Sequence, residues 1–301
     1  MKSIPYVQTS VFVDEKYPFG GNHLATFWDT SLNKALNKDE MQGIARQLNF
    51  SESTFLEEPT MKGCRSKIRI FTPSNELQFA GHPTLGSTFV AKYKGTVRSD
   101  EKTILVQLGI GPIRVEYLDS NRIQMSQPAP SFMEEVSDTK KICEAIGLEQ
   151  KDISTKCPVQ VVTTGFPFLI VPISTLSAVQ RAVPNPNLIL ENLKELSTQK
   201  ILIFTTETVN RNSSVHARIF APSVGVLEDP ATGSAAGPLG AYLEKYNILK
   251  GHDFGQPIDI EQGYEVNRPS RLIATIPNES MEEIYVAGRV RLVAEGTFYL
   301  N

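Results

Sequence analysis

The chain has 301 residues, of which 41% are hydrophobic and 21% are charged, a composition typical of a globular protein with a full apolar core. Its length favours two ordinary domains over a single large one. Thirty Lys and Arg against 33 Asp and Glu give a formal net charge of −3, so no overall positive field would attract a nucleic acid or an anionic membrane.

The beginning of the chain, MKSIPYVQTSVFVDEKYPFGG, has no basic stretch followed by an apolar core, so we expect no secretory signal. No segment approaches the roughly 20 uninterrupted apolar residues of a membrane-spanning helix. The cysteines Cys64, Cys143 and Cys157 form no CxxC pair, which argues against a disulfide framework and against a thiolate metal site. We therefore expect a cytoplasmic protein.

Helical and strand patterns are mixed along the chain. Residues 37–48 predict a helix, because apolar residues recur at helical spacing and Asn37 with Glu40 has the form of a capping box. Residues 103–117 predict two strands around a Gly-Ile-Gly-Pro turn, and residues 138–146 a second helix. Further strand-like segments are VQVVTTGFPFLIVPI and EIYVAGRVRLVAEGTFYL. The predicted class is mixed α and β, rich in strand.

The chain contains an internal similarity. RIFTPS, from Arg69, and RIFAPS, from Arg218, share five of six residues at an offset of 149, which is almost half the chain. The similarity can be extended by laying GHPTLGS, from Gly81, on DPATGS, from Asp229. So long a period indicates two copies of one domain rather than a solenoid.

Each copy is expected to continue from a strand and a small-residue turn into a buried helix. We predict these helices over residues 84–93 and 232–246; Pro238 predicts a kink in the second helix or a later start. A helix N-terminus offers unbonded N–H groups and partial positive charge, so both helices could hold a carboxylate-bearing substrate in an interdomain cleft. His82 is expected just before the first helix and Asp229 just before the second.

Glu52 is a candidate acid/base residue. In SESTFL it stands among small hydroxyl residues and is followed by apolar ones, an environment that would raise the pKa of its carboxyl group toward a catalytic range. We expect the corresponding strand of the second half in TTGFPFLIV, residues 163–171, which carries no acid, histidine or cysteine. Only one half is therefore expected to supply a base.

Other conspicuous residues are expected to be structural. Arg69 and Arg218 should pair with carboxylates or carbonyls of their own domains. Four scattered histidines without ligand spacing argue against a metal site, with His216 expected before a strand and His252 in a loop. GSAAGPLG matches neither a phosphate-binding loop nor a dinucleotide fingerprint, so no nucleotide cofactor is expected.

Five co-ordered segments form a pattern that runs from about residue 6 to the end of the chain: FGGNHLATF, SESTFL, RIFTPSNELQFAGHPTLGSTFV, ARIFAPSVGVLEDPATGSAAGPLGAYL and EQGYEVNRPS, followed by closing strands in YVAGRVRLVAEGTF. The resemblance is to the PhzF-like isomerase family, named for an enzyme of phenazine biosynthesis. It implies the α+β fold of diaminopimelate epimerase, in which two similar domains each wrap a β-sheet around a central helix and the active site lies between them.

The resemblance also implies a domain division and a site. The final strand would return to the first domain, giving residues 1–127 with 288–301 and residues 128–287. The family's acid/base glutamate falls on Glu52, with His82, Asp229 and Ser234 orienting the substrate. The implied substrate-binding residues are Gly21, Asn22, Gly81, Thr232 and Gly233.

The chemistry that the resemblance implies uses no cofactor or metal. Glu52 would take a proton from one carbon of a small, cyclic, conjugated carboxylic acid and return it to another carbon. His23 stands where the family has proline, a departure that bears on substrate identity. A homodimer is expected as the commonest state of soluble enzymes of this size.

Two alternatives stay open from sequence alone. One is a catalytically inactive protein that binds a small molecule on the same fold. The other is a racemase or epimerase that does not use cysteine: related epimerases use a cysteine pair at the starts of the two helices, which this chain lacks. Such an enzyme would need a second base, for which Asp229 is the only candidate in the sequence.

Overall fold

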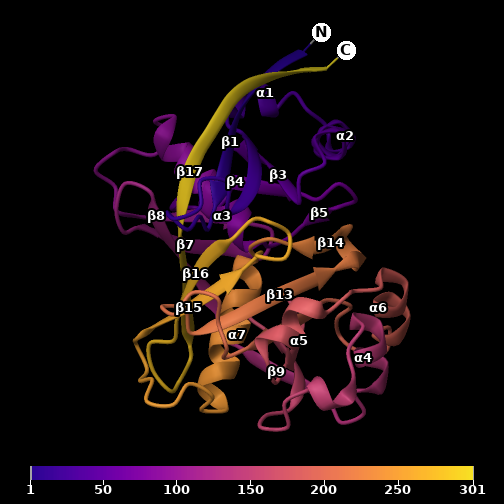
Figure 1. Ribbon diagram of the computed structural model, residues 1–301. Helices are drawn as coiled ribbons and strands as arrows, with labels where there is room; N and C mark the ends of the chain where they lie inside the picture. The colour runs from indigo at the N-terminus through magenta and orange to yellow at the C-terminus, as the bar shows by residue number, and fades with distance from the viewer. Residues whose placement is uncertain (1, 301) are drawn as a thin grey trace. The chain divides into compact units, whose positions relative to one another are not determined.

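The structure is a computed structural model and describes residues 2–300. The chain divides into two compact units, each built of strands and a central helix (Figure 1). Unit 1 comprises the residues up to Ser126 together with those from Ala287 onward, and unit 2 comprises Gln127–Val286. The predicted α+β class is confirmed by the element content of both units.

The elements of unit 1 are β1 (Lys2–Val11), β2 (Asn22–Phe27), α1 (Thr30–Asn33), α2 (Lys38–Leu48), β3 (Glu52–Glu57), β4 (Cys64–Phe71), β5 (Glu76–Leu77), α3 (Gly81–Tyr93), β6 (Thr103–Leu108), β7 (Gly111–Tyr117) and β8 (Arg122–Pro128), whose last two residues belong to unit 2. The predicted helix at residues 37–48 is confirmed, because Asn37 and Glu40 form the complete capping box of α2. The two strands predicted in residues 103–117 are β6 and β7.

The elements of unit 2 are β9 (Ser131–Val136), α4 (Lys140–Ile146), a 3₁₀ turn (Gln150–Asp152), β10 (Val159–Thr163), β11 (Phe168–Pro172), α5 (Leu176–Arg181), α6 (Pro186–Asn192), β12 (Ile201–Thr205), β13 (Val215–Ala221), a 3₁₀ turn (Pro222–Val224), β14 (Val226–Asp229), α7 (Gly233–Lys245), β15 (Pro257–Gln262) and β16 (Ser270–Thr275). The last strand, β17 (Glu283–Leu300), begins in unit 2 and continues through unit 1. The helix predicted at residues 138–146 is α4.

The two units share one strand plan. In unit 1, β1–β2 is antiparallel, β2–β3 parallel, β3–β4 antiparallel, β4–β6 parallel and β6–β7 antiparallel. In unit 2, the same directions recur in β10–β11, β11–β12, β12–β13, β13–β15 and β15–β16. The first strand of each series has one further antiparallel partner, β17 for β1 and β9 for β10. The internal repeat read from RIFTPS and RIFAPS therefore covers a whole unit.

The registers fix which residues correspond between the units. Ser53 of β3 pairs with Phe71, and Ile201 of β12 pairs with Phe220, so β3 corresponds to β12. The expectation that TTGFPFLIV supplies the counterpart of β3 is wrong, because that segment forms the end of β10, a turn and β11. The residue that corresponds to Glu52 is Lys200.

The central helices α3 and α7 are buried on nearly all sides, because their first halves consist of small and apolar residues. The predicted start of α3 at residue 84 is wrong. The helix begins at Gly81, since Pro83 in the first turn needs no N–H partner, so His82 lies within the first turn rather than before it. The matching first residue of α7 is Gly233, not Asp229, so the predicted alignment of GHPTLGS with DPATGS is also wrong.

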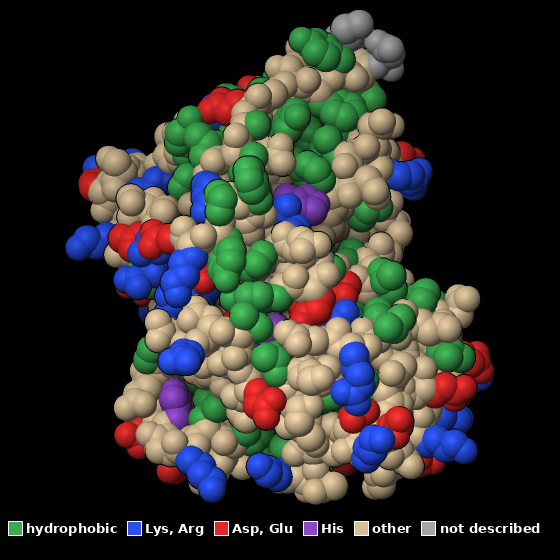
Figure 2. Space-filling model, viewed as in Figure 1, with side chains coloured by type: hydrophobic (Ala, Val, Ile, Leu, Met, Phe, Trp, Pro, Cys, Tyr) green, Lys and Arg blue, Asp and Glu red, His purple; other side chains and the backbone are tan. Residues whose placement is uncertain are grey.

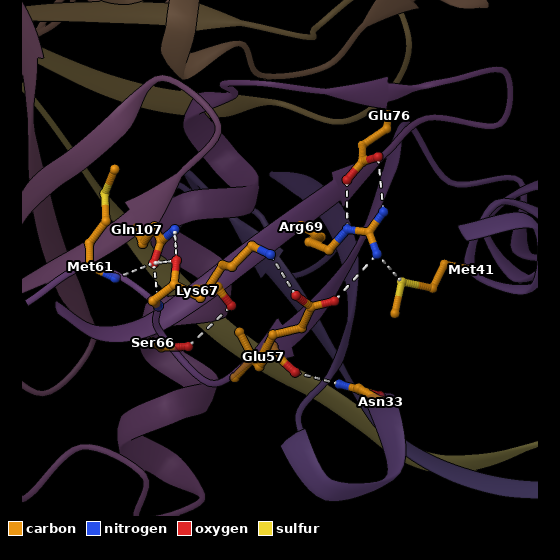
Figure 3. Close-up of polar contacts among 11 residues, drawn as sticks. Asn33, Met41, Glu57, Met61, Ser66, Lys67, Arg69, Glu76 and Gln107 are labelled. Carbon is orange, nitrogen blue, oxygen red and sulfur yellow. Dashed lines mark hydrogen bonds and ion pairs between the residues drawn. The ribbon is translucent and has the colours of Figure 1, made fainter. Parts of the chain in front are cut away.

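The two repeated arginines are structural, as predicted. Arg69 forms a double hydrogen bond with Glu76 and reaches Glu57 at 3.3 Å (Figure 3). Arg218 makes the same double contact with Glu228 and donates to the carbonyls of Val179 and Ala182. Each arginine therefore ties the repeated strand to its neighbour within one unit.

Candidate active site

Glu52 is the first residue of β3, directly opposite Leu24 of β2. Its side chain is 12% exposed, and its Oε2 atom lies 3.3 Å from Nε2 of His82. Alternation along β3 turns Glu52 and Thr54 to the same face, and Thr54 accepts a hydrogen bond from Ser87 of α3. The carboxylate therefore faces the first turn of the central helix of unit 1.

His82 is the second residue of α3 and is 3% exposed. The amide Nδ2 of Asn22 lies 3.1 Å from its Nδ1 atom. Because an amide nitrogen only donates, Nδ1 accepts, and a neutral ring then carries its proton on Nε2, the nitrogen that faces Glu52. Asn22 thus sets the tautomer and orientation of the ring that contacts the candidate base.

The turn before β2 positions Asn22. Gly21 has φ +83°, a left-handed conformation that favours glycine. The next residue along β2 after Asn22 is His23, whose ring packs edge-on against Phe50 with centroids 4.4 Å apart. Phe50 precedes Glu52 by two residues. The histidine that replaces the family's proline at position 23 therefore contacts a residue close in sequence to the candidate base.

In unit 2, Asp229 ends β14 and three residues separate it from α7. Its carboxylate accepts a hydrogen bond from the hydroxyl of Thr232, and its side chain is nearly buried. Gln262, at the end of β15, donates to the carbonyl of Asp229 at 2.6 Å and to Thr232 Oγ1 at 3.1 Å. Its Oε1 atom accepts from the backbone N–H of Thr232. One amide side chain therefore holds both ends of the loop.

The first turn of α7 contains Gly233 and Ser234, both buried. Gln127 donates to the carbonyl of Gly233 at 2.9 Å and in turn accepts from Thr164. Pro238 lies inside the helix, so the predicted later start is wrong; having no N–H, it leaves the carbonyl of Ser234 without its usual helical partner. The first turn of α7 thus has backbone N–H groups at its start and one carbonyl without a helical partner.

A buried ion cluster includes Glu261, the neighbour in sequence of Gln262, which holds the Asp229–Thr232 loop. His216, expected before a strand, is in fact the second residue of β13 and has no exposed surface. Its Nδ1 atom lies 2.8 Å from Glu261 and its Nε2 atom 3.0 Å from Glu265, two acids that stand on either side of Gln262 in the sequence. Burial lowers the pKa of His216, but hydrogen bonds to the two carboxylates outweigh burial and raise that pKa to about 9. The ring is therefore cationic at neutral pH.

The structure brings Glu52, His82 and Asn22 together in unit 1, with Gly21 directly before Asn22 and Gly81 as the first residue of the helix that carries His82. In unit 2 it brings together the other four predicted site residues, Asp229, Thr232, Gly233 and Ser234. The prediction that both groups share one site between the domains stays a prediction.

Sequence reasoning missed Gln262 and Gln127. The two glutamines lie 30 or more residues from the groups they hold and sit in unremarkable strand ends. Only the hydrogen bonds of the folded protein reveal their role.

None of the three cysteines lies in the first turn of α3 or α7. Cys64 is in β4, Cys143 is in α4, and Cys157 precedes β10; burial raises the pKa of each thiol. Within residues 2–300, no group of three or more His, Cys, Asp or Glu side chains is arranged to hold a metal ion. No helix in that range is long and apolar enough to cross a membrane.

Comparison with curated proteins identifies relatives over most of the chain. Trans-2,3-dihydro-3-hydroxyanthranilate isomerase of Pseudomonas aeruginosa is 33% identical over 304 residues, covering 98% of this chain and 99% of that protein. An uncharacterized isomerase of Bacillus subtilis is 33% identical over 238 residues, covering 78% of this chain and 79% of that protein.

Solved structures show the same fold. A phenazine biosynthesis protein of the PhzF family from Bacillus anthracis superposes with a TM-score of 0.88 at 28% identity, covering 100% of both chains. A probable proline racemase from Agrobacterium radiobacter shares the fold alone, with a TM-score of 0.68 at 10% identity over 99% of this chain and 93% of that chain. The family described as "Phenazine biosynthesis-like protein" matches residues 9–296. The chain therefore belongs to the PhzF-like family of isomerases.

Proposed function

We propose that the chain is a cofactor-independent isomerase that moves a proton within a small cyclic carboxylic acid, with Glu52 as the acid/base. The observation that carries the proposal is the contact of the nearly buried Glu52 carboxylate with His82, whose ring is oriented by Asn22. A nearly buried carboxylate beside an oriented imidazole ring has the defined position that proton transfer at carbon requires.

In the proposed reaction, Glu52 takes a proton from one ring carbon and the electron pair of the broken C–H bond enters the conjugated system. The carboxyl group, whose proton exchanges with solvent, then donates a proton to a second carbon of the same system. Both steps use one base, and no outside oxidant or reductant is needed. His82 keeps the carboxylate in place, while the loop Asp229–Thr232 and the first turn of α7 bind polar groups of the substrate.

The substrate of the Pseudomonas relative, trans-2,3-dihydro-3-hydroxyanthranilate, is the first compound to test. Proton NMR in D₂O would follow deuterium uptake at a ring carbon with wild-type protein and with Glu52→Gln. Loss of an acid/base group lowers turnover by about 10²–10⁴-fold, so we expect uptake with the wild type and near-background uptake with the variant.

Glu57→Gln is the matched control, because Glu57 lies at the other end of the same strand and pairs with Arg69 and Lys67. It should leave the rate of deuterium uptake within about threefold of wild type. Normal turnover by Glu52→Gln would show that another group is the base. Absence of turnover by the wild type would exclude this substrate.

A further inference from the structure

Lys200 is unlike the other lysines of the chain. Within residues 2–300 it is the only buried lysine, with 8% of its surface exposed, and its Nζ atom makes no hydrogen bond or ion pair there. Figure 2 shows the usual position of Lys and Arg side chains, which extend from the surface of both units and often lie near carboxylates. The contacts of Lys200 Nζ are aromatic: Phe166, with the ring centroid at 4.0 Å, and Phe168, at 6.0 Å.

The strand register places Lys200 on the face of the sheet that α7 covers. Ile201 and Ile203 belong to the apolar cluster formed with α4, α5 and α6. Side chains alternate along a strand, so Lys200 points to the other face, as does Phe204, which contacts Tyr242 of α7.

Lys200 lies toward the first turn of α7. Four residues of strand from Phe204 back to Lys200 span about 13 Å, and nine residues of helix from Tyr242 back to Gly233 span about 14 Å. The shared strand plan indicates that Lys200 and the start of α7 lie at the same end, because Glu52, at the corresponding position of unit 1, contacts the first turn of α3.

The Lys200 ammonium group ends a side chain that is largely buried and has no anion beside it, which destabilises the ligand-free protein. Burial alone lowers the pKa of Lys200 to about 8, and no carboxylate opposes that effect. The aromatic contacts offset only part of the lost hydration. At neutral pH the group is still mostly protonated, so a bound anion would supply the counterion that the chain does not.

We propose that Lys200 is a substrate-binding residue whose ammonium group holds the carboxylate of a cyclic acid lying against Phe166. A singly charged carboxylate is favoured over a phosphate dianion, because one cation balances one charge and the Asp229 carboxylate borders the same helix turn. The inference rests on the proposed function for the substrate class and adds the residue that recognises its acidic group.

The test is binding of anthranilate, a stable aromatic carboxylate, measured by calorimetry with wild type, Lys200→Met and Lys200→Arg. Aniline, which lacks only the carboxylate, controls for ring binding. We expect Lys200→Met to weaken anthranilate binding about 10- to 100-fold, as for loss of one charged hydrogen bond, and Lys200→Arg to restore most of it. Aniline binding should be equal in all three proteins.

Thermal unfolding separates this role from a structural one. Replacing an unbalanced buried charge with methionine should keep or raise the Tm of the ligand-free protein while binding is lost. Lys245→Met is the matched control, because Lys245 also lies over a ring, Phe132 at 3.8 Å, but is exposed. It should bind anthranilate as the wild type does.

Equal binding of anthranilate by wild type and Lys200→Met overturns the assignment, and so does a wild type that binds anthranilate no better than aniline. A lowered Tm with unchanged binding would make Lys200 structural. If anthranilate binding depends on Lys200 but the dihydro substrate is not turned over, the inference stands and the proposed reaction fails.

Discussion

Replacement of His216 by glutamine should remove a pH-dependent part of the stability of unit 2. Both nitrogens of the His216 ring face carboxylates, Glu261 at 2.8 Å and Glu265 at 3.0 Å, so both must donate and the ring is an imidazolium in the folded state. Glu261 is itself held by the N–H groups of Val209 and Asn210. A glutamine side chain at this position would keep at most one of the two contacts and would carry no charge at any pH.

The magnitude follows from the pKa of His216. It is about 9 in the folded protein, against 6.5 for an unperturbed histidine, and at 1.36 kcal/mol per unit this interval corresponds to roughly 3 kcal/mol. Because the folded-state pKa is the higher one, the contribution is fully present below pH 6.5 and is lost as the pH rises through 9. For a unit of this size the change in Tm is roughly 6–12 °C.

The assay is thermal unfolding of the full chain from pH 6 to pH 10, followed by far-UV circular dichroism for wild type and His216→Gln. Lys200 acts in the opposite direction: its folded-state pKa of about 8 lies below the ordinary 10.5, so its contribution rises with pH between those values. The informative quantity is therefore the difference in Tm between the two proteins, in which the lysine effect cancels. We expect that difference to be largest at pH 6 and to shrink toward pH 10; a constant difference would refute the assignment of a buried imidazolium.

Two further variants test packing and loop geometry. A Cβ atom at Gly86 of α3 would lie 2.5 Å from Cδ2 of Leu24, so Gly86→Ala should destabilise unit 1 by about 1–3 kcal/mol in urea unfolding. Gly43→Ala, where the new atom meets nothing within 4 Å, should instead stabilise α2 by about 0.5–1 kcal/mol. A Gly86→Ala protein more stable than Gly43→Ala would contradict this packing. Gln262→Leu should lower both kcat and Tm, because the hydrogen bonds of the buried Gln262 hold the Asp229 loop; an unchanged kcat would show that the loop needs no such support.

Local signals in the sequence were sufficient for some elements. The capping box of α2 and the turn between β6 and β7 depend on residues three to five positions apart, so their prediction was confirmed. The start of α3 was missed because Ala80 provides no side-chain cap and GHP has the composition of a turn. Burial, not a local signal, stabilises that first turn.

The residues of unit 2 that we propose to bind the substrate could be identified only from the folded structure. Glu52 could be proposed from its own motif, whereas Lys200 is preceded by STQ and resembles a surface lysine at the end of a polar stretch. Its correspondence to Glu52 follows only from the pairing of β12 with β13. Gln262 likewise reaches Asp229 across 33 residues, a contact that no spacing rule predicts.

The pairing of β1 with β17 has a bearing on how the chain folds during synthesis. Lys2 lies opposite Leu300, so the first and last strands run side by side (Figure 1). At ribosomal rates of 5–20 residues per second, β1 waits roughly 15–60 s for this partner, with one edge open to other strands. Every strand pairing described within unit 2 becomes available earlier. Unit 2 is thus the first to be able to complete its sheet, although it lies second in the sequence.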